Sequence, residues 1–215
     1  MTADANAMRI RPTPARPLEG GEMFAGLDAS VIDFWRWALS DLRMNTIRPM
    51  VAEFLVAKAV GDARPVREAW GNFDVLAPEG IRIEVKSSGY CQSWAQRELS
   101  TINFGRLAAR SWDAETGELS SEPEVRADVF VFAVQSCKDC SRYDPMDTGQ
   151  WQFWVVAADD IRGYRWNTVG LRWVQKHARG SVSWSGLRDA ILHARDAGVT
   201  SDAGSTPPDS SLRSE

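Results

Sequence analysis

Apolar residues recur along the chain with two different periods, which predict helices near its amino end and strands in its middle. Residues 28–43 (DASVIDFWRWALSDLR) carry a helical pattern behind Asp28, the predicted N-cap. Its apolar positions are Val31, Phe34, Trp35, Ala38 and Leu42. Residues 48–62 (RPMVAEFLVAKAVGD) carry a second helical pattern, with Pro49 in its first turn and Gly61 at its end. We therefore expect two helices before the first strand.

Shorter patterns farther along the chain predict strands. Residues 73–76 (FDVL) and 81–87 (IRIEVKS) are joined by the turn-forming sequence APEG, and together they predict a hairpin. Residues 128–134 (DVFVFAV) and 151–157 (WQFWVVA) are continuously apolar, which is typical of strands covered on both faces. The more polar sequence between these pairs contains one predicted helix, at residues 103–111.

The end of the patterned region predicts the last elements of a single domain. Residues 181–195 (SVSWSGLRDAILHAR) predict a short strand, a turn and a closing helix from about Ser185. The order of elements predicts an α/β fold, in which a mixed sheet of four or five strands is flanked by helices. A chain of 215 residues suits one domain. We place this domain at residues 28–200, between a flexible tail (1–27) and a disordered Ser/Pro/Asp-rich tail (201–215).

Charge and cysteine content bear on the partner and the compartment. The formal net charge is -4, so the chain lacks the strongly basic balance that would itself indicate a nucleic-acid partner. No apolar run is long enough for a signal peptide or a membrane span. Three cysteines, Cys91, Cys137 and Cys140, are an odd and sparse set that argues against a disulfide framework. We expect a cytoplasmic protein without a membrane partner, and a plain loop at the unmatched Cys137-x-x-Cys140 pair.

The strongest candidate for chemistry lies in residues 81–87. Because side chains alternate along a strand, the apolar residues share one face and Arg82, Glu84 and Lys86 share the other. The predicted hairpin brings Asp74 beside Glu84, so that two carboxylates and one ammonium converge. Carboxylate oxygens on a rigid platform suit Mg²⁺, and Lys86 can position the attacking water or stabilise developing negative charge.

The same alternation has a second interpretation, because charged residues on one face of a strand are often only its solvated side. The context favours a site. Asp74 lies ten residues upstream of Glu84 on a strand that can pair with it, and Glu53 lies in the preceding helix. Two small hydroxyl residues, Ser87 and Ser88, follow the lysine.

These residues resemble the motif of the PD-(D/E)XK nuclease superfamily, whose members include type II restriction endonucleases and Holliday-junction resolvases. The matching positions are Asp74 in WGNFDVL and Glu84-Val85-Lys86 in IRIEVKSS, with Phe73 where the motif often has proline. In the superfamily the Asp and Glu bind the metal and the Lys serves catalysis. The resemblance therefore implies Asp74, Glu84 and the Val85 carbonyl as metal ligands, and Lys86 as a catalytic group.

The resemblance also bears on Glu53, on the fold and on the cofactor. Many members place a Glu of the preceding helix near the metal, and Glu53 in RPMVAEFLVAKAVG matches that position. The resemblance therefore implies Glu53 as a further catalytic residue and metal ligand. The alternative is a helix-surface Glu that pairs with Arg48 or with solvent. The implied fold is a four-stranded mixed sheet flanked by helices, and the implied cofactor is Mg²⁺, for which Mn²⁺ can substitute.

The implied activity is hydrolysis of phosphodiester bonds in DNA, and we expect a restriction or phage-defence endonuclease. The alternatives are a repair or recombination nuclease and a non-cleaving DNA-binding or interaction module. Because cutting both strands of a duplex from one small site per chain calls for two-fold symmetry, we also expect a homodimer. Gln92, Trp94 and Gln96 follow the strand and can contact phosphate or a base, the alternative being a polar loop around one packed Trp.

Overall fold

The computed structural model describes residues 13, 15–69, 71–113 and 116–202. Its α-helices are α1 (Val31–Leu39), α2 (Arg48–Val60), α3 (Ala158–Arg162), α4 (Leu171–His177) and α5 (Leu187–Asp202). Its strands are β1 (Val75–Leu76), β2 (Arg82–Gly89), β3 (Asn103–Gly105), β4 (Trp112–Asp113), β5 (Glu118–Leu119), β6 (Val129–Gln135), β7 (Trp151–Ala157), β8 (Thr168–Gly170) and β9 (Ser181–Val182). Two short 3₁₀ helices are η1 (Thr148–Gln150) and η2 (Trp184–Gly186).

The central sheet has five strands in the order β1-β2-β6-β7-β9. β2 and β6 are parallel, and the other neighbouring pairs are antiparallel. The predicted α/β fold with one mixed sheet of four or five strands and flanking helices is therefore confirmed. The predicted hairpin (β1 and β2), the two apolar strands (β6 and β7) and the closing strand, turn and helix (β9, η2 and α5) are also confirmed.

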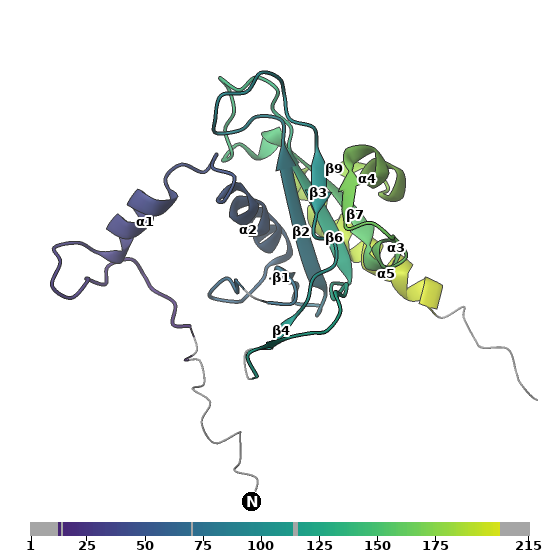
Figure 1. The fold of residues 1–215 in the computed structure, drawn as a ribbon, viewed down its shortest axis with the longest axis horizontal. Helices are drawn as coiled ribbons and strands as arrows, with labels where there is room; N and C mark the ends of the chain where they lie inside the picture. The colour runs from purple at the N-terminus through teal and green to yellow at the C-terminus, as the bar shows by residue number, and fades with distance from the viewer. Residues whose placement is uncertain (1–12, 14, 70, 114–115, 203–215) are drawn as a thin grey trace, which may run out of the picture.

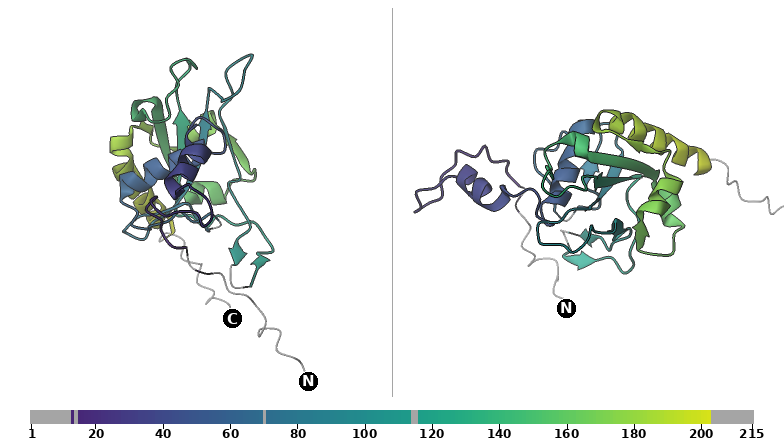
Figure 2. Two further views of the ribbon diagram at one scale, coloured as in Figure 1. Left: turned by 90° about the vertical axis from the view of Figure 1, so that its left-hand side faces the viewer. Right: turned by 90° about the horizontal axis from the view of Figure 1, so that it is seen from above.

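Helices and a small second sheet cover the two faces of the central sheet (Figures 1 and 2). α2 and α5 lie on one face, while α3, α4 and the β3–β8 pair lie on the other. The alternation along β6 divides its side chains between these layers. Val131 and Ala133 join the cluster beneath α2 and α5, whereas Phe130 and Phe132 join the opposite cluster. Burial on both faces explains why β6 is apolar without interruption before Gln135.

The second helical pattern is confirmed as α2, and the structure explains how it ends. α2 begins at Arg48 with Pro49 in its first turn, where a missing N–H costs no helical hydrogen bond. Gly61 caps its carboxyl end with φ of 79°, a left-handed conformation that favours glycine, and its N–H donates to the Ala57 carbonyl.

The predicted helix at residues 103–111 is wrong. Its first residues form β3, which pairs with β8, and Phe104 is buried with its ring centroid 4.9 Å from that of Phe132. Arg106 then has φ of 55°, which ends any regular element. Pairing with a strand more than 60 residues away and the burial of Phe104 outweigh the local spacing of apolar residues.

The first helical pattern forms α1, but Ser30 and not Asp28 is its N-cap. Ser30 donates its N–H to the Asp33 carboxylate over 2.9 Å and completes a capping box with that residue. α1 stands clear of the central sheet (Figures 1 and 2), and Val31 is its one buried residue.

A disulfide joins Cys91 to Cys140 across 49 residues, with the Cα atoms 5.4 Å apart. The prediction that the cysteines form no disulfide is wrong for this pair. The segments that follow β2 and β6 meet because these strands are paired from Ile83–Val129 to Gly89–Gln135. The number of cysteines alone does not reveal this pairing. Cys137 keeps a free thiol and lies in the loop after β6, as expected for the Cys137-x-x-Cys140 segment.

Reducing this disulfide should lower the free energy of unfolding by about 3 kcal/mol, because an open chain gains conformational entropy when it unfolds. Urea denaturation with and without dithiothreitol measures the difference. Cys140→Ser should match the reduced wild type and become insensitive to dithiothreitol, whereas Cys137→Ser should retain the full difference. Equal stability of oxidised and reduced wild-type protein would contradict this account.

Both ends of the chain extend past the described region. Residues 1–12, 14 and 203–215, which include about half of the predicted N-terminal tail and most of the predicted C-terminal tail, lie outside it. Residues 15–27 lead into α1 through turns, and α5 continues to Asp202. No helix in the described part of the chain is long and apolar enough to cross a membrane.

Candidate active site

The hairpin of β1 and β2 places Asp74 against β2. The Asp74 N–H donates to the Ile83 carbonyl over 3.0 Å, and its carboxylate accepts the N–H of Val85 over 2.8 Å. The carbonyl of Val85 lies on the same edge of β2 as its N–H, just past the point where pairing with β1 ends. The hairpin therefore fixes the Asp74 carboxylate beside the strand that carries Glu84.

Glu84 and Lys86 share a face of β2, as the alternation predicts, and they form an ion pair with Nζ–Oε1 of 2.5 Å. Their side chains are only 22% and 16% exposed. Arg82 on the same face is 45% exposed and pairs with Asp128 where β2 and β6 begin. The solvated-face interpretation thus fits Arg82, whereas Glu84 and Lys86 lie in a partly enclosed setting.

Glu53 is buried on the side of α2 that faces this region, and its carboxylate pairs with Arg67. Two nitrogens of the guanidinium, Nε and Nη2, donate to it, the second over 2.8 Å. The expected alternative partner, Arg48, instead donates to the Cys91 carbonyl. A buried carboxylate is costly without a cation, and Arg67 supplies that cation from the loop after α2.

The loop between α2 and β1 is held in place by Arg64. Its guanidinium donates to the Asp74 carbonyl over 2.6 Å and to the Asp62 carboxylate over 2.7 Å. Asp62 in turn accepts the N–H of Leu76 over 3.1 Å. This network fixes the backbone of Asp74, so its side chain is directed by β1, β2 and the loop together.

Asp74 has the most perturbed acid–base behaviour of these residues. Burial first, and then the negative charges of Glu84 and Glu53, together raise the pKa of its carboxyl from 3.8 to about 7. The hydrogen bond from Val85 and the charge of Lys86 act in the opposite direction and are outweighed. Burial and the two neighbouring carboxylates therefore outweigh the positive charge of Lys86 at Asp74.

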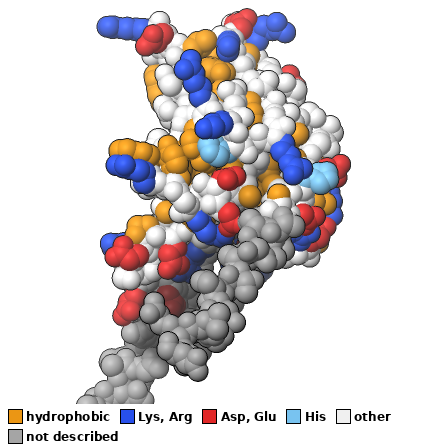
Figure 3. Space-filling view, turned by 90° about the vertical axis from the view of Figure 1, so that its right-hand side faces the viewer, with side chains coloured by type: hydrophobic (Ala, Val, Ile, Leu, Met, Phe, Trp, Pro, Cys, Tyr) orange, Lys and Arg blue, Asp and Glu red, His pale blue; other side chains and the backbone are white. Residues whose placement is uncertain are grey.

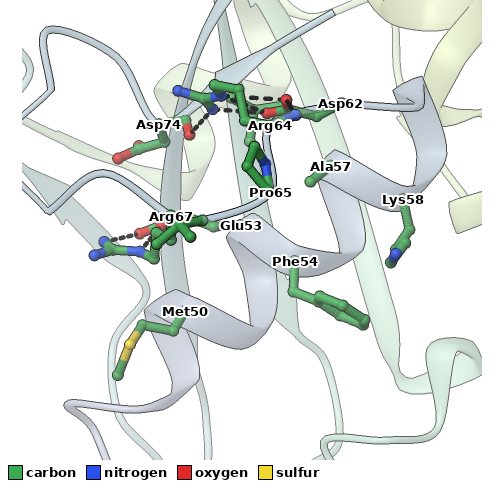
Figure 4. A pocket seen from close by; sticks show the side chains of 12 residues that line it. Met50, Glu53, Phe54, Ala57, Lys58, Asp62, Arg64, Pro65, Arg67 and Asp74 are labelled. Atoms are coloured by element: carbon green, nitrogen blue, oxygen red, sulfur yellow. Dashed lines mark hydrogen bonds and ion pairs between the residues drawn. The ribbon is translucent and has the colours of Figure 1, made fainter. Parts of the chain in front are cut away.

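Asp74 lies between two surface cavities. One, of about 300 Å³, is also lined by Glu84 and Lys86. The other, of about 370 Å³, is lined by Glu53, Arg67 and the outer side of α2. Figure 4 shows Asp74, Glu53 and Arg67 toward one end of this second cavity, with Phe54 and Lys58 toward the other. A ligand in the first cavity has direct access to Asp74.

Three arginines line the first cavity together with Lys86: Arg106, Arg110 and Arg126. Arg126 also pairs with Glu124 over 3.0 Å, and Arg106 has the left-handed backbone noted above. Guanidinium groups bind phosphate oxygens, often in pairs of hydrogen bonds. The part of the cavity lining that these arginines form therefore suits a polyanion.

The arginines and Arg67 are the residues that sequence reasoning missed. Arg106, Arg110 and Arg126 belong to segments between β3 and β6 with no regular spacing relative to Glu84. One feature of the sequence does indicate a cation such as Arg67 near Glu53. A carboxylate within an apolar helix, as at Glu53, requires a nearby cation.

The proposed DNA contacts Gln92, Trp94 and Gln96 line neither cavity. The amide nitrogen of Gln92 donates to Gly89 and Ser100, and that of Gln96 donates to Tyr90, Glu98 and Ser100. Trp94 remains 57% exposed. The two amides stabilise the loop after β2, and DNA contact by these residues stays a prediction.

The oxygen atoms of the site residues can be compared with the ligands that the predicted Mg²⁺ requires. In the described part of the chain, no three His, Cys, Asp or Glu side chains are arranged so that they could hold a metal ion. Glu53 is turned to Arg67, and Glu84 is turned to Lys86. Asp74 nevertheless accepts the N–H of Val85 and lies close enough to Glu84 for that negative charge to raise its pKa, and Mg²⁺ takes few protein ligands besides water and phosphate. These residues fit Mg²⁺ if substrate and water complete its coordination.

A comparison with known families now bears on this site. Residues 37–171 match the family of bacteriophage T4 endonuclease IV, and they make up more than half of the 215-residue chain. The chain belongs to this family. It is therefore a nuclease of the endonuclease IV family. No curated protein matches the chain in sequence.

The matched range includes every residue of the candidate site. It contains Glu53, Asp74, Glu84 and Lys86, and also the three arginines of the first cavity. The segment before α1, most of α1 itself, and all of β9 and α5 lie outside the matched range. The catalytic and metal-binding roles of the individual residues stay predictions.

Proposed function

We propose that this endonuclease IV family member is a Mg²⁺-dependent DNA endonuclease with a PD-(D/E)XK type of active site, acting in restriction or phage defence. The observation that carries the proposal is the setting of Asp74. Its carboxyl has a raised pKa, lies next to Glu84 and Lys86, and opens onto a cavity with an arginine-lined wall. Membership of a family named for an endonuclease supports the cleavage of nucleic acid.

Asp74, Glu84 and the Val85 carbonyl are the groups that would hold the cation. When bound, the cation neutralises charge on the phosphate and lowers the pKa of the attacking water. Lys86, whose Nζ lies 2.5 Å from Glu84 Oε1, would donate to the scissile phosphate. Arg106 and Arg110, which line the same cavity, would bind the neighbouring phosphates and fix the strand.

Cleavage assays on plasmid DNA and on single-stranded DNA test the proposal. We expect phosphodiester cleavage with Mg²⁺ or Mn²⁺ and none with EDTA, while an RNA of the same sequence stays intact. Cleavage that persists in EDTA would overturn the metal dependence. Cleavage of RNA alone would overturn the choice of DNA.

Glu53→Gln should raise the Mg²⁺ concentration for half-maximal cleavage by about 10-fold, the smaller effect typical of a group that supports metal ligands from outside the coordination shell. Its carboxylate contributes negative charge near Asp74 although it pairs with Arg67. Cleavage rate as a function of Mg²⁺ concentration measures the shift. The matched control is Glu68→Gln on the neighbouring loop, where the side chain is 66% exposed. An unchanged Mg²⁺ dependence of Glu53→Gln would make Glu53 a purely structural partner of Arg67.

A further inference from the structure

Residues 18–44 form an arm that stands off the body of the protein (Figures 1 and 2). The arm has its own local order. The N–H of Val31 donates to Glu22 and that of Ile32 donates to Gly20, each over 2.9 Å. Phe24 packs edge-on against Phe34 with ring centroids 6.4 Å apart. The arm is therefore a small structured unit, and its carboxyl end at residues 40–43 adjoins the body, where it lines a cavity together with residues 141–146.

The arm carries most of the large apolar side chains that the described residues expose to solvent. Nine of the sixteen lie in it: Leu18, Met23, Phe24, Leu27, Ile32, Phe34, Trp37, Leu39 and Met44. Trp37 is 83% exposed, the largest fraction among them. With roughly 200 Å² for a large side chain, their exposed area is on the order of 900 Å² per chain. Soluble monomers rarely expose an apolar patch above a few hundred Å².

The length of α1 is a second, independent indication that another surface covers the arm. α1 has nine residues, and isolated helices shorter than about 12–15 residues are marginal in water. Helices in proteins are stabilised chiefly by packing of an apolar face, yet α1 covers neither face of the central sheet. Something outside the described contacts of this chain must cover the arm.

The area indicates a second copy of the chain. If each joint covers about half of the exposed apolar area of one arm with an equal area of the partner, two joints bury on the order of 1,800 Å² in total, which lies within the range of about 1,200–2,000 Å² buried in a stable protein–protein interface. Among the described residues, α3, α4 and α5 contribute none of the exposed large apolar side chains. On that side of the molecule Figure 3 shows apolar side chains interrupted by charged and polar ones.

A complementary surface lies on α2, close to the root of the arm. The apolar residues that line the cavity of about 370 Å³ include Phe54, Ala57 and Pro65, and Figure 4 shows these three on the side of the cavity away from Glu53 and Arg67. Phe54 is 58% exposed although it sits on a helix whose other face is core. We call this side of the cavity the α2 groove.

Charge is also complementary between the arm and the α2 groove. Residues 18–44 contain five acidic and two basic side chains. Lys58 at the rim of the groove lies over the Phe54 ring, 5.3 Å from its centroid, and forms no ion pair with any described residue. Asp28 on the arm likewise has no ion pair among the described residues.

We propose that the arm of each chain docks into the α2 groove of a second copy, which gives an arm-exchanged homodimer. Trp37 and Phe34 occupy the groove, and the acidic arm lies along Lys58 of the partner. The exchange is reciprocal, so one two-fold axis relates two identical joints and the assembly closes as a dimer. This inference does not depend on the nuclease chemistry, since it uses only the arm and the outer side of α2.

Sedimentation equilibrium on the full chain tests the exchange. We expect a dimer for the wild type, and a dissociation constant about 30-fold higher or more for Trp37→Glu, as for loss of an interface hot spot. Phe54→Glu should have the same effect from the groove side, and its new carboxylate precedes Lys58 by four residues on α2, so the helix keeps a favourable pair. Trp166→Glu, at an exposed tryptophan outside the arm and the groove, is the control and should leave the constant unchanged.

A photo-crosslink identifies the partner of the arm. Wild-type chains labelled with ¹⁵N are mixed with unlabelled chains that carry p-benzoyl-phenylalanine in place of Trp37. Crosslinks from position 37 to residues 50–67 of the labelled chain support the exchange. Crosslinks within one chain, crosslinks between two arms, a wild type that stays monomeric at all concentrations, or a Phe54→Glu variant that dimerises normally would each overturn it.

Discussion

Lys86→Ala is expected to lower the rate of DNA cleavage at saturating Mg²⁺ by about 100- to 1,000-fold, the loss seen when a positioned donor to a developing anion is removed. Asp74→Ala and Glu84→Ala should also abolish cleavage, but through weaker metal binding, so high concentrations of Mn²⁺ should restore part of their rate. Lys86→Ala should not respond to metal in this way. Its ammonium is no ligand, and its removal frees Glu84 from the ion pair between them.

Calorimetric titration with Mg²⁺ alongside the cleavage rates separates these two kinds of loss. Arg82→Ala is the matched control, because Arg82 lies on the same face of β2 but pairs with Asp128 where β2 and β6 begin. It should leave cleavage unchanged, and the unfolding temperatures of all four variants should show that the fold persists. If Asp74→Ala, Glu84→Ala and Lys86→Ala cleave as fast as Arg82→Ala, the charged face of β2 is only a solvated surface.

The central part of the fold follows from local patterns. Continuous apolar runs predict β6 and β7 because both of their faces are buried. The alternation in β2 predicts which of its residues face the core, and Ile83 and Val85 are indeed buried. The turn between Asp74 and Glu84 predicts that these two carboxylates meet, because a hairpin is a local structure.

Features that depend on distant segments could not be predicted in this way. The strand β3 exists because it pairs with β8, and nothing in residues 103–111 carries that information. The disulfide of Cys91 and Cys140 depends on the parallel pairing of β2 with β6. The arginines of the first cavity reach it from segments without regular structure. Helical spacing correctly predicts α1, but spacing alone does not reveal which surface covers its apolar residues.

Asp74→Asn is expected to increase stability at pH 8 while it abolishes cleavage. In the folded protein the pKa of Asp74 is raised from 3.8 to about 7, so the folded state holds this proton while the unfolded chain has released it. The free energy of unfolding therefore falls as the pH rises from about 4 to above 7, by about 4 kcal/mol for a difference of this size. Asparagine has no proton to lose, so the variant escapes this cost.

Urea denaturation in EDTA gives the free energy of unfolding of Asp74→Asn and of wild type at pH 5 and at pH 8. The effect is the change, between the two pH values, in the difference between these two free energies. Mg²⁺ should stabilise the wild type at pH 8 by binding the ionised carboxylate, and it should stabilise Asp74→Asn much less. Asp128→Asn provides a control of opposite sign. The ion pair with Arg82 lowers the pKa of Asp128 despite its partial burial, so its ionised form stabilises the fold above pH 4 and its replacement lowers stability at both pH values. If Asp74→Asn is no more stable than wild type at pH 8 without metal, the ionised Asp74 carboxylate does not destabilise the fold, and the proposed metal site loses the observation on which it depends.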